Sequence, residues 1–400
     1  MAKGANTKGA KGMMMLEAYA ERYRRDLFDS VIPFWERHSL DREHGGYFTC
    51  LDRDGSVYDS RKYVWLQGRA VWMFARLYNT VERRQAWLDA ATLGVEFLRR
   101  HARDGEGRVF FSLTREGQPH FFQRKPYGAV FYQMGLLEYA RATGDAACLA
   151  EAVELFWQIV GWIADPALLG RQALPGQAPM SKLADLLVVG MMAADLAQQL
   201  DDPRYLQVVR DTLAGVARHY DPARRIFREH VAHDGRDLMD TPEGRLFLPG
   251  HSIETAWIVL HMLDLVPSAE HTTMALEAVE GSLELGWDAG HGGLLYFMDL
   301  AGRPTLQLEA TMKLWWPHAE AIYALVLAAV RTGEPRWLRW LERVDAYTYS
   351  HFPDPEHGEW FGYLERDGSL ALSSKGGNYK GFFHVPRALL FSVQAIEARI

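Results

Sequence analysis

The 400-residue sequence has only two cysteines, Cys50 and Cys148, and they stand far apart. They form neither a CxxC pair nor a disulfide framework, which favours unreactive thiols in a reducing, cytoplasmic compartment. The N-terminus contains lysine and glycine but no apolar segment of signal-peptide length, so we expect residues 1–15 to be a disordered tail. No apolar run approaches the ~18 residues that span a bilayer, so we expect no membrane partner.

A segregated basic patch is also missing. The 44 basic and 51 acidic residues give a net charge of −7. Such a charge repels phosphate backbones, so nucleic acid is not an expected partner. The Walker-type phosphate loop and the GxSxG nucleophile elbow are absent as well. With 48% hydrophobic and 24% charged residues, the chain has the composition of a globular protein with a large core.

What the sequence does contain is a repeat. The motif Asp-x-x-His-Gly, followed by aromatic residues, occurs at 41–48, 288–297 and 354–363, and weaker copies occur at 104–122 and 221–239. Turn residues between short aromatic segments predict β-hairpins. The histidines of the strong copies, His44, His291 and His357, invite a metal site. Because the same motif recurs in separate hairpins, it favours a turn-forming device, and we predict neither a metal nor a redox cofactor.

Segments with apolar residues at helical spacing lie between these hairpins. The predicted helices are 16–38, 63–79, 85–102, 127–143, 147–163, 181–199, 203–219, 252–266, 270–285, 314–332, 335–350 and 384–398. Arranged as six pairs without a polar capping repeat, they predict an all-α fold, an (α/α)6 barrel. In this closed toroid of six helical hairpins, the short β-hairpins would lie at the active-site mouth. We expect residues 16–400 to form a single domain.

In such a ring, the starts of alternate helices would converge on one mouth. The polar side chains at these starts are Arg69, His251, Glu254, His318, Glu320, His384 and Arg387. A few polar groups converging on an aromatic wall are typical of small-molecule sites. Further candidates for contact with a ligand at these starts are Tyr63, Gln67, Trp72, Tyr127, Met180, Trp316 and Lys380. Tryptophan at helical spacing also fits a place in the core.

Two histidines stand out among these residues. His251 follows a Pro-Gly break, and Glu254 lies three residues later on the same helical face, where it could orient the imidazole. His384 begins another helix, with Pro386 as a helix-start residue behind it. Each could instead be a satisfied core histidine. Their occurrence at different helix starts strengthens the reading as a proton-transfer pair.

A possible ion pair links two further candidates. Arg69 lies in a run of aromatic residues and leucine, where a guanidinium is costly unless it is paired. Glu320, in the first turn of a later helix, could supply the partner carboxylate. The alternative for Glu320 is a favourable interaction with the helix dipole.

Several segments together resemble the N-acylglucosamine 2-epimerase family, which includes the renin-binding proteins. They are "EHGGYFTCLDRDGSVYDSRKYVWLQGRAVWMFARLYN", "PGHSIETAW", "GWDAGHGGLLYF", "MKLWWPHAEA", "FPDPEHGEWFGYL" and "KGGNYKGFFHVPR". The resemblance covers nearly the whole chain after about residue 16 and keeps the order of the motifs. One departure is Phe382, where several members have a cysteine, so this position offers no thiol for catalysis.

The resemblance implies an (α/α)6 barrel, a homodimer, and interconversion of N-acetylglucosamine and N-acetylmannosamine, a sialic acid precursor. It implies ATP as an activator that is not consumed, at a site that no motif locates. By motif, the essential arginine falls on Arg69, the glutamate on Glu320 and the catalytic histidines on His251 and His384. Cellobiose and mannose 2-epimerases keep a similar His-x-x-Glu and final histidine, so the substrate is less firmly implied than the reaction type.

Inversion at C2 of an open-chain aldose requires removal of a proton from one face and its return to the other. Two histidines suit this task because their pKa lies near neutral pH. Arg69 would stabilise the enolate oxygen, Glu254 would fix the tautomer of His251, and Glu320 would pair with Arg69 or a sugar hydroxyl. The rival interpretations are an (α/α)6 glycosidase, which needs two carboxylates roughly 6.5–9.5 Å apart if it inverts, and a non-catalytic binding protein.

Overall fold

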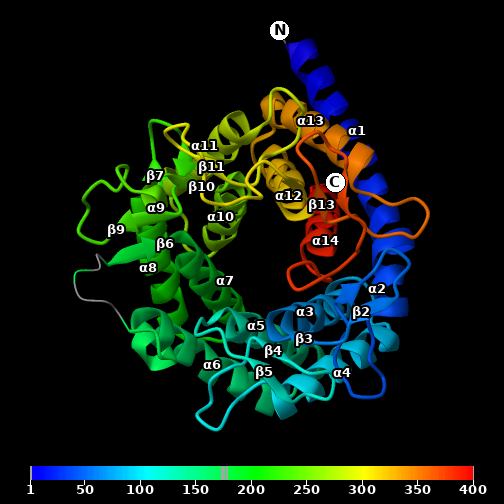
Figure 1. Cartoon of the computed structure of the whole chain (residues 1–400). Helices are drawn as coiled ribbons and strands as arrows, with labels where there is room; N and C mark the ends of the chain where they lie inside the picture. The colour runs from blue at the N-terminus through cyan, green and yellow to red at the C-terminus, as the bar shows by residue number, and fades with distance from the viewer. Residues whose placement is uncertain (1, 173–175, 177–178, 400) are drawn as a thin grey trace. The chain divides into compact units, whose positions relative to one another are not determined.

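The computed structural model describes residues 2–172, 176 and 179–399, with side chains from residue 12 onward. Helices account for most of the chain, and the strands are only two or three residues long (Figure 1). The chain divides into two compact units. The first unit comprises Met1–Val31, Ala178–Leu372 and His384–Ile400, and the second comprises Ile32–Gln177 and Ser373–Phe383. The prediction of one domain from residue 16 onward is not tested by this division.

The second unit contains two helical hairpins and two small antiparallel sheets. Its helices are α2 (Ile32–His38), α3 (Val64–Thr80), α4 (Gln85–His101), α5 (Tyr127–Thr143), α6 (Ala146–Ala164) and the short 3-10 helix η2 (Pro166–Leu169). Its strands are β1 (Cys50–Leu51), β2 (Val57–Asp59), β3 (Lys62–Tyr63), β4 (Ser112–Leu113) and β5 (Pro119–Phe121). Strand β1 pairs with β2, and β4 pairs with both β3 and β5. Helix α3 packs against α4 and α5, and α5 packs against α6.

The first unit contains further helical hairpins. Its helices are α1 (Ala2–Arg25), the π-helical turn η1 (Asp26–Val31), α7 (Leu183–Gln199), α8 (Pro203–His219), α9 (Pro242–Arg245), α10 (Pro249–Met262), α11 (Ala269–Gly286), α12 (Trp315–Thr332), α13 (Pro335–His351) and α14 (His384–Glu397). Its strands are β6 (Met180–Lys182), β7 (Tyr220–Asp221), β8 (Ile226–Phe227), β9 (His230–Ala232), β10 (Leu246–Phe247), β11 (Met298–Asp299), β12 (Lys313–Leu314), β13 (Tyr363–Leu364) and β14 (Leu370–Leu372). The antiparallel pairs are β6–β9, β7–β8, β10–β11, β12–β13 and β13–β14.

The helix predictions agree closely with the structure in eleven of the twelve segments. The exception is the predicted helix 16–38, because α1 begins at Ala2 and the predicted segment is divided among α1, η1 and α2. Helix α10 begins at Pro249, three residues earlier than expected. Proline suits the first helical turn because its fixed φ and missing N–H cost nothing there.

The paired helices differ in how they are buried. In α8, the buried residues Tyr205, Val209, Leu213 and Val216 form one stripe, as expected for a helix with one face on the core. Helix α12 is buried on nearly every side, and so is α10. Helix α10 contacts α7 and α12, and α12 contacts α14. Polar side chains at the starts of α10, α12 and α14 are thereby held on a rigid apolar core.

Helix α6 requires a correction to the expectation from hydropathy. Over 19 residues its mean hydropathy is 1.4, so by length and composition it could cross a bilayer. It packs against α5, however, and Glu151 on α6 accepts a hydrogen bond from Arg99 at 3.0 Å. Tyr132 of α5 also donates to Glu151, at 2.5 Å. These contacts join α6 to α4 and α5, and 33% of its apolar window is buried in the structure.

The Asp-x-x-His-Gly motif forms turns, as predicted. Asp41 Oδ1 accepts hydrogen bonds from the backbone N–H groups of Glu43 and His44, both at 3.2 Å. Asp288 does the same for the backbone of Gly290 and His291. These aspartates satisfy backbone donors of their own turns, which is why the motif recurs without marking one converging site.

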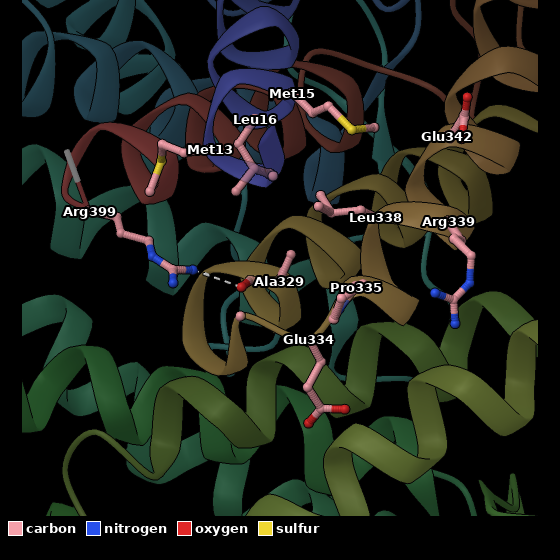
Figure 2. Close-up of a pocket in the computed structure, with 12 residues that line it drawn as sticks. Met13, Met15, Leu16, Ala329, Glu334, Pro335, Leu338, Arg339, Glu342 and Arg399 are labelled. Atoms are coloured by element: carbon pink, nitrogen blue, oxygen red, sulfur yellow. Dashed lines mark hydrogen bonds between the residues drawn. The ribbon is translucent and has the colours of Figure 1, made fainter. Parts of the chain in front are cut away.

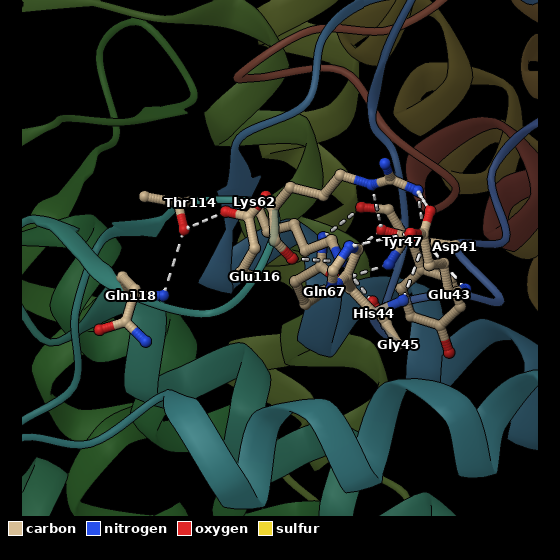
Figure 3. Close-up of polar contacts among 11 residues, drawn as sticks. Asp41, Glu43, His44, Gly45, Tyr47, Lys62, Gln67, Thr114, Glu116 and Gln118 are labelled. Atoms are coloured by element: carbon tan, nitrogen blue, oxygen red, sulfur yellow. Dashed lines mark hydrogen bonds and ion pairs between the residues drawn. The ribbon is translucent and has the colours of Figure 1, made fainter.

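Two of these turns also carry a buried ion pair, a feature that the sequence did not reveal. The Lys62 ammonium lies 2.9 Å from Asp41 Oδ2, and Arg115 Nε lies 2.9 Å from the same oxygen. Figure 3 shows Asp41 and Lys62 among the polar contacts of this turn. Lys313 bonds Asp288 at 3.0 Å in the corresponding place. Because Lys62 and Lys313 each stand two residues before the first residue of α3 and of α12, these pairs anchor the chain where it enters the two helices.

Candidate active site

The start of α10 is held very close to α12. A Cβ atom at Gly250 would lie 2.8 Å from Pro317 Cβ and 2.9 Å from Trp316 Cζ3, which is closer than carbon atoms tolerate. Glycine is therefore required for this approach of the two helices. Ser252 adds a second constraint, since its hydroxyl accepts a hydrogen bond from Phe227 N at 2.9 Å. The intervening residue, His251, is thus placed by packing on both sides.

The partner of His251 is Glu229 and not Glu254, which corrects the prediction. Nδ1 of His251 lies 3.1 and 3.0 Å from the two carboxylate oxygens of Glu229. A carboxylate accepts, so Nδ1 carries the proton, and Nε2 is the nitrogen available for proton exchange. The i,i+3 spacing does place Glu254 on the same helix face, but its carboxylate has another partner.

The charges around His251 favour its protonated form. Burial alone would lower the pKa of His251, but the nearby charge and hydrogen bond of Glu229 outweigh burial. The charges of Glu254 and Glu320 act in the same direction, and together they raise the pKa to about 9. At neutral pH, His251 is therefore an imidazolium that can give up a proton.

The second histidine belongs to a shared network. Nδ1 of His384, at the start of α14, donates to Glu320 Oε1 at 2.7 Å. Nη2 of Arg387 donates to the same oxygen and to Glu254 Oε1, both at 2.7 Å. Glu320 Oε2 accepts from the indole N–H of Trp257 at 2.8 Å. The partners that the structure gives Glu320 are thus Trp257, His384 and Arg387, and the expected partner, Arg69, belongs to the other unit.

Both imidazoles contact the same tryptophan. The ring centroid of Trp316 lies 6.0 Å from that of His251 and 5.8 Å from that of His384. Trp316 is half-buried, and 21% of the His251 side chain remains exposed. A half-buried indole between two imidazoles is a surface on which the apolar face of a sugar can stack.

Glu254, Glu320 and His384 could also serve as metal ligands, since one ligand atom from each lies within 4.8 Å of the others. The Arg387 guanidinium lies 2.7 Å from both carboxylates and already supplies a positive charge to them. Burial opposes the charge on Arg387, but the two carboxylates outweigh it and raise its pKa. This arrangement favours an ion-pair network over a metal site.

The second unit holds Arg69, on α3. Its guanidinium lies over three aromatic rings, with centroid distances of 3.9 Å to Phe131, 4.8 Å to Trp65 and 4.9 Å to Phe383. Only 8% of the residue is exposed. Cation–π contacts of this kind fix the plane of a guanidinium.

Two predicted substrate contacts have structural roles. Gln67 is fully buried, and its amide accepts from Tyr47 N at 2.7 Å and donates to Tyr47 O at 2.8 Å. Lys380 is 1% exposed and donates to Lys375 O at 2.7 Å. We therefore assign Gln67 to the Asp41 turn and Lys380 to the loop before Phe383.

His318 is also a structural residue, in contrast to its predicted place at the mouth. It is fully buried, accepts from Leu294 N at 3.0 Å through Nε2 and donates to Leu314 O at 2.6 Å through Nδ1. Burial lowers the pKa of His318 to about 3, so it stays neutral. Its two bonds hold the start of α12.

Of the remaining predicted contacts, two lie at helix starts, as expected, and two do not. Tyr63 is the residue before α3, and its ring meets Phe111 edge-on; Trp72 lies further along α3. Tyr127 begins α5 and is half-buried, and Met180 begins β6. Their contact with a substrate stays a prediction.

A cavity of about 480 Å³ lies in the first unit, beside α1 and α13 (Figure 2). Among the described residues that line it are Met13, Leu16, Leu338, Arg339 and Arg399. The predicted catalytic side chains of this unit are not in that lining. Neither His251 nor His384 therefore lines this cavity.

The family model of the N-acylglucosamine 2-epimerases matches residues 46–388. The chain belongs to this family. The N-acylglucosamine 2-epimerase of Bos taurus is 43% identical over 395 residues, which cover 94% of this chain and 90% of the relative. That of Homo sapiens is 43% identical over 403 residues, which cover 96% and 91%. The predicted family and enzyme class, a sugar epimerase, are confirmed.

A solved structure supports the fold. The cellobiose 2-epimerase of Bacillus thermoamylovorans aligns with a TM-score of 0.82 at 20% identity, over 94% of this chain and 99% of its own. At this identity the likeness shows the fold alone. The predicted α/α-barrel class, with short strand pairs between the helices, is confirmed.

Sequence reasoning missed Glu229 and Trp257. Glu229 lies in a weak copy of the repeat and has no spacing relation to His251. Trp257, in the third turn of α10, has no spacing relation to Glu320 that would single it out. The hydrogen bond from its indole to Glu320 emerges only when α10 packs on α12.

Proposed function

We propose that the protein interconverts N-acetylglucosamine and N-acetylmannosamine by inverting C2 of the open-chain sugar. The observation that carries this proposal is the pair of imidazoles, each with Nδ1 on a carboxylate, against one indole. Relatives with the N-acylglucosamine 2-epimerase name, 43% identical over nearly the whole chain, support the choice of substrate.

The chemistry follows from the two ring nitrogens. With Nδ1 held by a carboxylate, Nε2 of one histidine removes the C2 proton of the aldehyde form, and the electron pair moves onto the carbonyl oxygen at C1. Nε2 of the other histidine then gives its proton to C2 from the opposite face, and the enolate collapses to the aldehyde. One proton leaves and one arrives, so the product is the C2 epimer with unchanged composition.

Arg69 is proposed to stabilise the enolate oxygen. Its guanidinium is fixed over Trp65, Phe131 and Phe383, so its donors need little reorganisation when charge develops. Trp316 is proposed to stack on the sugar and hold C2 between the imidazoles.

The alternative substrates are free mannose and cellobiose, or an aldose–ketose exchange on the same enolate. They are kept because a cellobiose 2-epimerase shares the fold. The amino sugar is preferred because the N-acylglucosamine 2-epimerases are the relatives at 43% identity.

We further propose a homodimer, activation by ATP and a cytoplasmic location, all of which rest on the family resemblance and on composition. In this setting the reaction would supply N-acetylmannosamine as a sialic acid precursor. Sedimentation velocity tests the dimer, and paired assays with and without ATP test activation.

The deciding experiment is a substrate panel followed by NMR of the anomeric protons. N-acetylglucosamine, N-acetylmannosamine, mannose and cellobiose are incubated separately with the wild-type protein and with the variant His251→Asn. We expect conversion between the two N-acetyl sugars, with at least a 100-fold slower rate in the variant. Conversion of mannose or cellobiose alone would move the protein to the alternative, and release of a monosaccharide from cellobiose would support a glycosidase.

A further inference from the structure

The backbone around Glu229 is fixed to the start of α10. Glu229 lies between β8 and β9, and its carbonyl accepts from Leu183 N at 2.9 Å. Two residues earlier, Phe227 N donates to the Ser252 hydroxyl. Ser252 is the neighbour of His251, so one short segment contacts two successive residues of α10. These hydrogen bonds fix the backbone on either side of Glu229, and the fixed backbone places the carboxylate next to the imidazole.

The carboxylate of Glu229 serves one imidazole. Both of its oxygens lie within 3.1 Å of His251 Nδ1, and only 6% of the residue is exposed. Within the described part of the chain, no other side chain donates a hydrogen bond to this carboxylate. Burying a carboxylate is costly unless it is paired, so this position selects a charged imidazole partner.

The other carboxylates that face His251 are compensated. Glu254 on α10 and Glu320 on α12 share the Arg387 guanidinium of α14 at 2.7 Å each. Their effect on His251 is thereby partly cancelled by a fixed positive charge. Glu229, on the segment between β8 and β9, is hydrogen-bonded to His251, and its charge also acts on His219.

We propose that Glu229 is the positioning residue for His251, holding the Nδ1 proton so that Nε2 faces the substrate and so that the imidazole enters the reaction in its charged form. This inference deepens the proposed function and rests on it. A hydrogen-bonded second residue of this kind fixes both the tautomer and the orientation of the group that reacts. Glu254, by contrast, holds Arg387 and acts on His251 only through its charge.

The variant Glu229→Gln tests this role because it keeps the side-chain shape and removes the charge. In the wild type, activity should fall as His251 loses its proton near pH 9. In the variant, this fall should move toward ~6.5, the ordinary value for histidine. We expect kcat at pH 8 to fall roughly 10- to 100-fold with little change in KM, as for other residues that orient a reacting group.

Two further variants make the result specific. Glu229→Asp keeps the charge on a shorter side chain and should retain the wild-type pH profile, with a smaller loss of kcat. Glu243→Gln removes an exposed carboxylate from the same unit and should change neither the pH profile nor kcat. A pH profile of Glu229→Gln identical to that of the wild type would overturn the proposal.

NMR titration of protein labelled with ¹⁵N-histidine separates this proposal from the proposed function. The His251 signal is assigned by its loss in His251→Asn. It should titrate near pH 9 in the wild type and clearly lower in Glu229→Gln. If the wild type epimerises no sugar but the titration shifts, the proposed function fails and the pairing stands. If the wild type is active and the titration is unchanged in the variant, the role of Glu229 is wrong.

Discussion

The two histidines of the site are held in different ways. His251 is hydrogen-bonded to the carboxylate of Glu229, which lies in the segment between β8 and β9. His384 shares Glu320 with an arginine and an indole, and Arg387 in turn carries Glu254. Both arrangements place a carboxylate on Nδ1 and direct Nε2 outward, but they leave different net charges near the ring.

This difference teaches how one active site can hold a proton donor and a proton acceptor of the same residue type. An uncompensated carboxylate favours imidazolium, whereas a carboxylate already paired with a guanidinium favours it less. Epimerisation needs one histidine in each protonation state when the sugar binds. The surroundings of His251 and His384 differ in their charged partners before any substrate arrives.

The largest expected effect is on turnover. His251→Asn and His384→Asn should each lower the rate of epimerisation by roughly 10²–10⁴-fold, because each removes one of the two proton-transfer groups. The rate is measured by NMR, with His233→Asn as a control at an exposed position. A variant at His251 or His384 with near-normal turnover would remove that residue from the proton-transfer pair.

The network of His384, Glu320 and Arg387 should contribute more to the free energy of unfolding than the pair of His251 and Glu229. Arg387→Met leaves Glu254 and Glu320 buried without their cation and should lower the free energy of unfolding by about 3–5 kcal/mol. Arg331→Met removes a more exposed pair with Asp264 and should cost about 0–1 kcal/mol. Urea unfolding measures both, and equal losses would contradict a structural role for the network.

The close packing of α10 against α12 should affect stability and activity more than the loss of a glycine's backbone freedom does. Gly250→Ala introduces a methyl group against Pro317 and Trp316 and should cost about 1–3 kcal/mol of stability, with reduced kcat as His251 shifts. Gly105→Ala meets no atom within 4 Å and serves as the control. Thermal unfolding and initial rates measure the two effects; a Gly250→Ala variant as stable and active as Gly105→Ala would show that α10 tolerates displacement.

Much of the fold follows from sequence, since apolar spacing located the helices and the turn motif located the hairpins. Within the site, local spacing was misleading. Glu254 stands three residues after His251 but pairs with Arg387, which stands three residues after His384. Side chains that share a helix face are bound by whatever the neighbouring helix presents, and that depends on packing. His318 illustrates the same point, because its burial against Tyr347 and Phe352 could not be told from a place at the mouth.

The smallest expected effect is on the pH dependence of stability. The pKa of His251 is raised to about 9, above its value of ~6.5 in the unfolded chain, so its contribution is complete below pH 6.5 and is lost as the pH rises through 9. His318 has a lowered pKa, about 3, so its contribution is lost as the pH falls below 6.5. His251→Asn should flatten the alkaline loss of Tm, and His318→Gln the acid loss. Unchanged slopes would contradict these charge assignments.

The most direct test of the central claim, inversion at C2 by two separate histidines, is the fate of hydrogen during the first turnovers in D₂O. N-acetylglucosamine is incubated with the wild-type protein, and the substrate and product are analysed by NMR at low conversion. Two groups on opposite faces predict that nearly every product molecule carries deuterium at C2 while the remaining substrate stays unlabelled. Product that retains the original hydrogen, or substrate that exchanges faster than product forms, would contradict the claim.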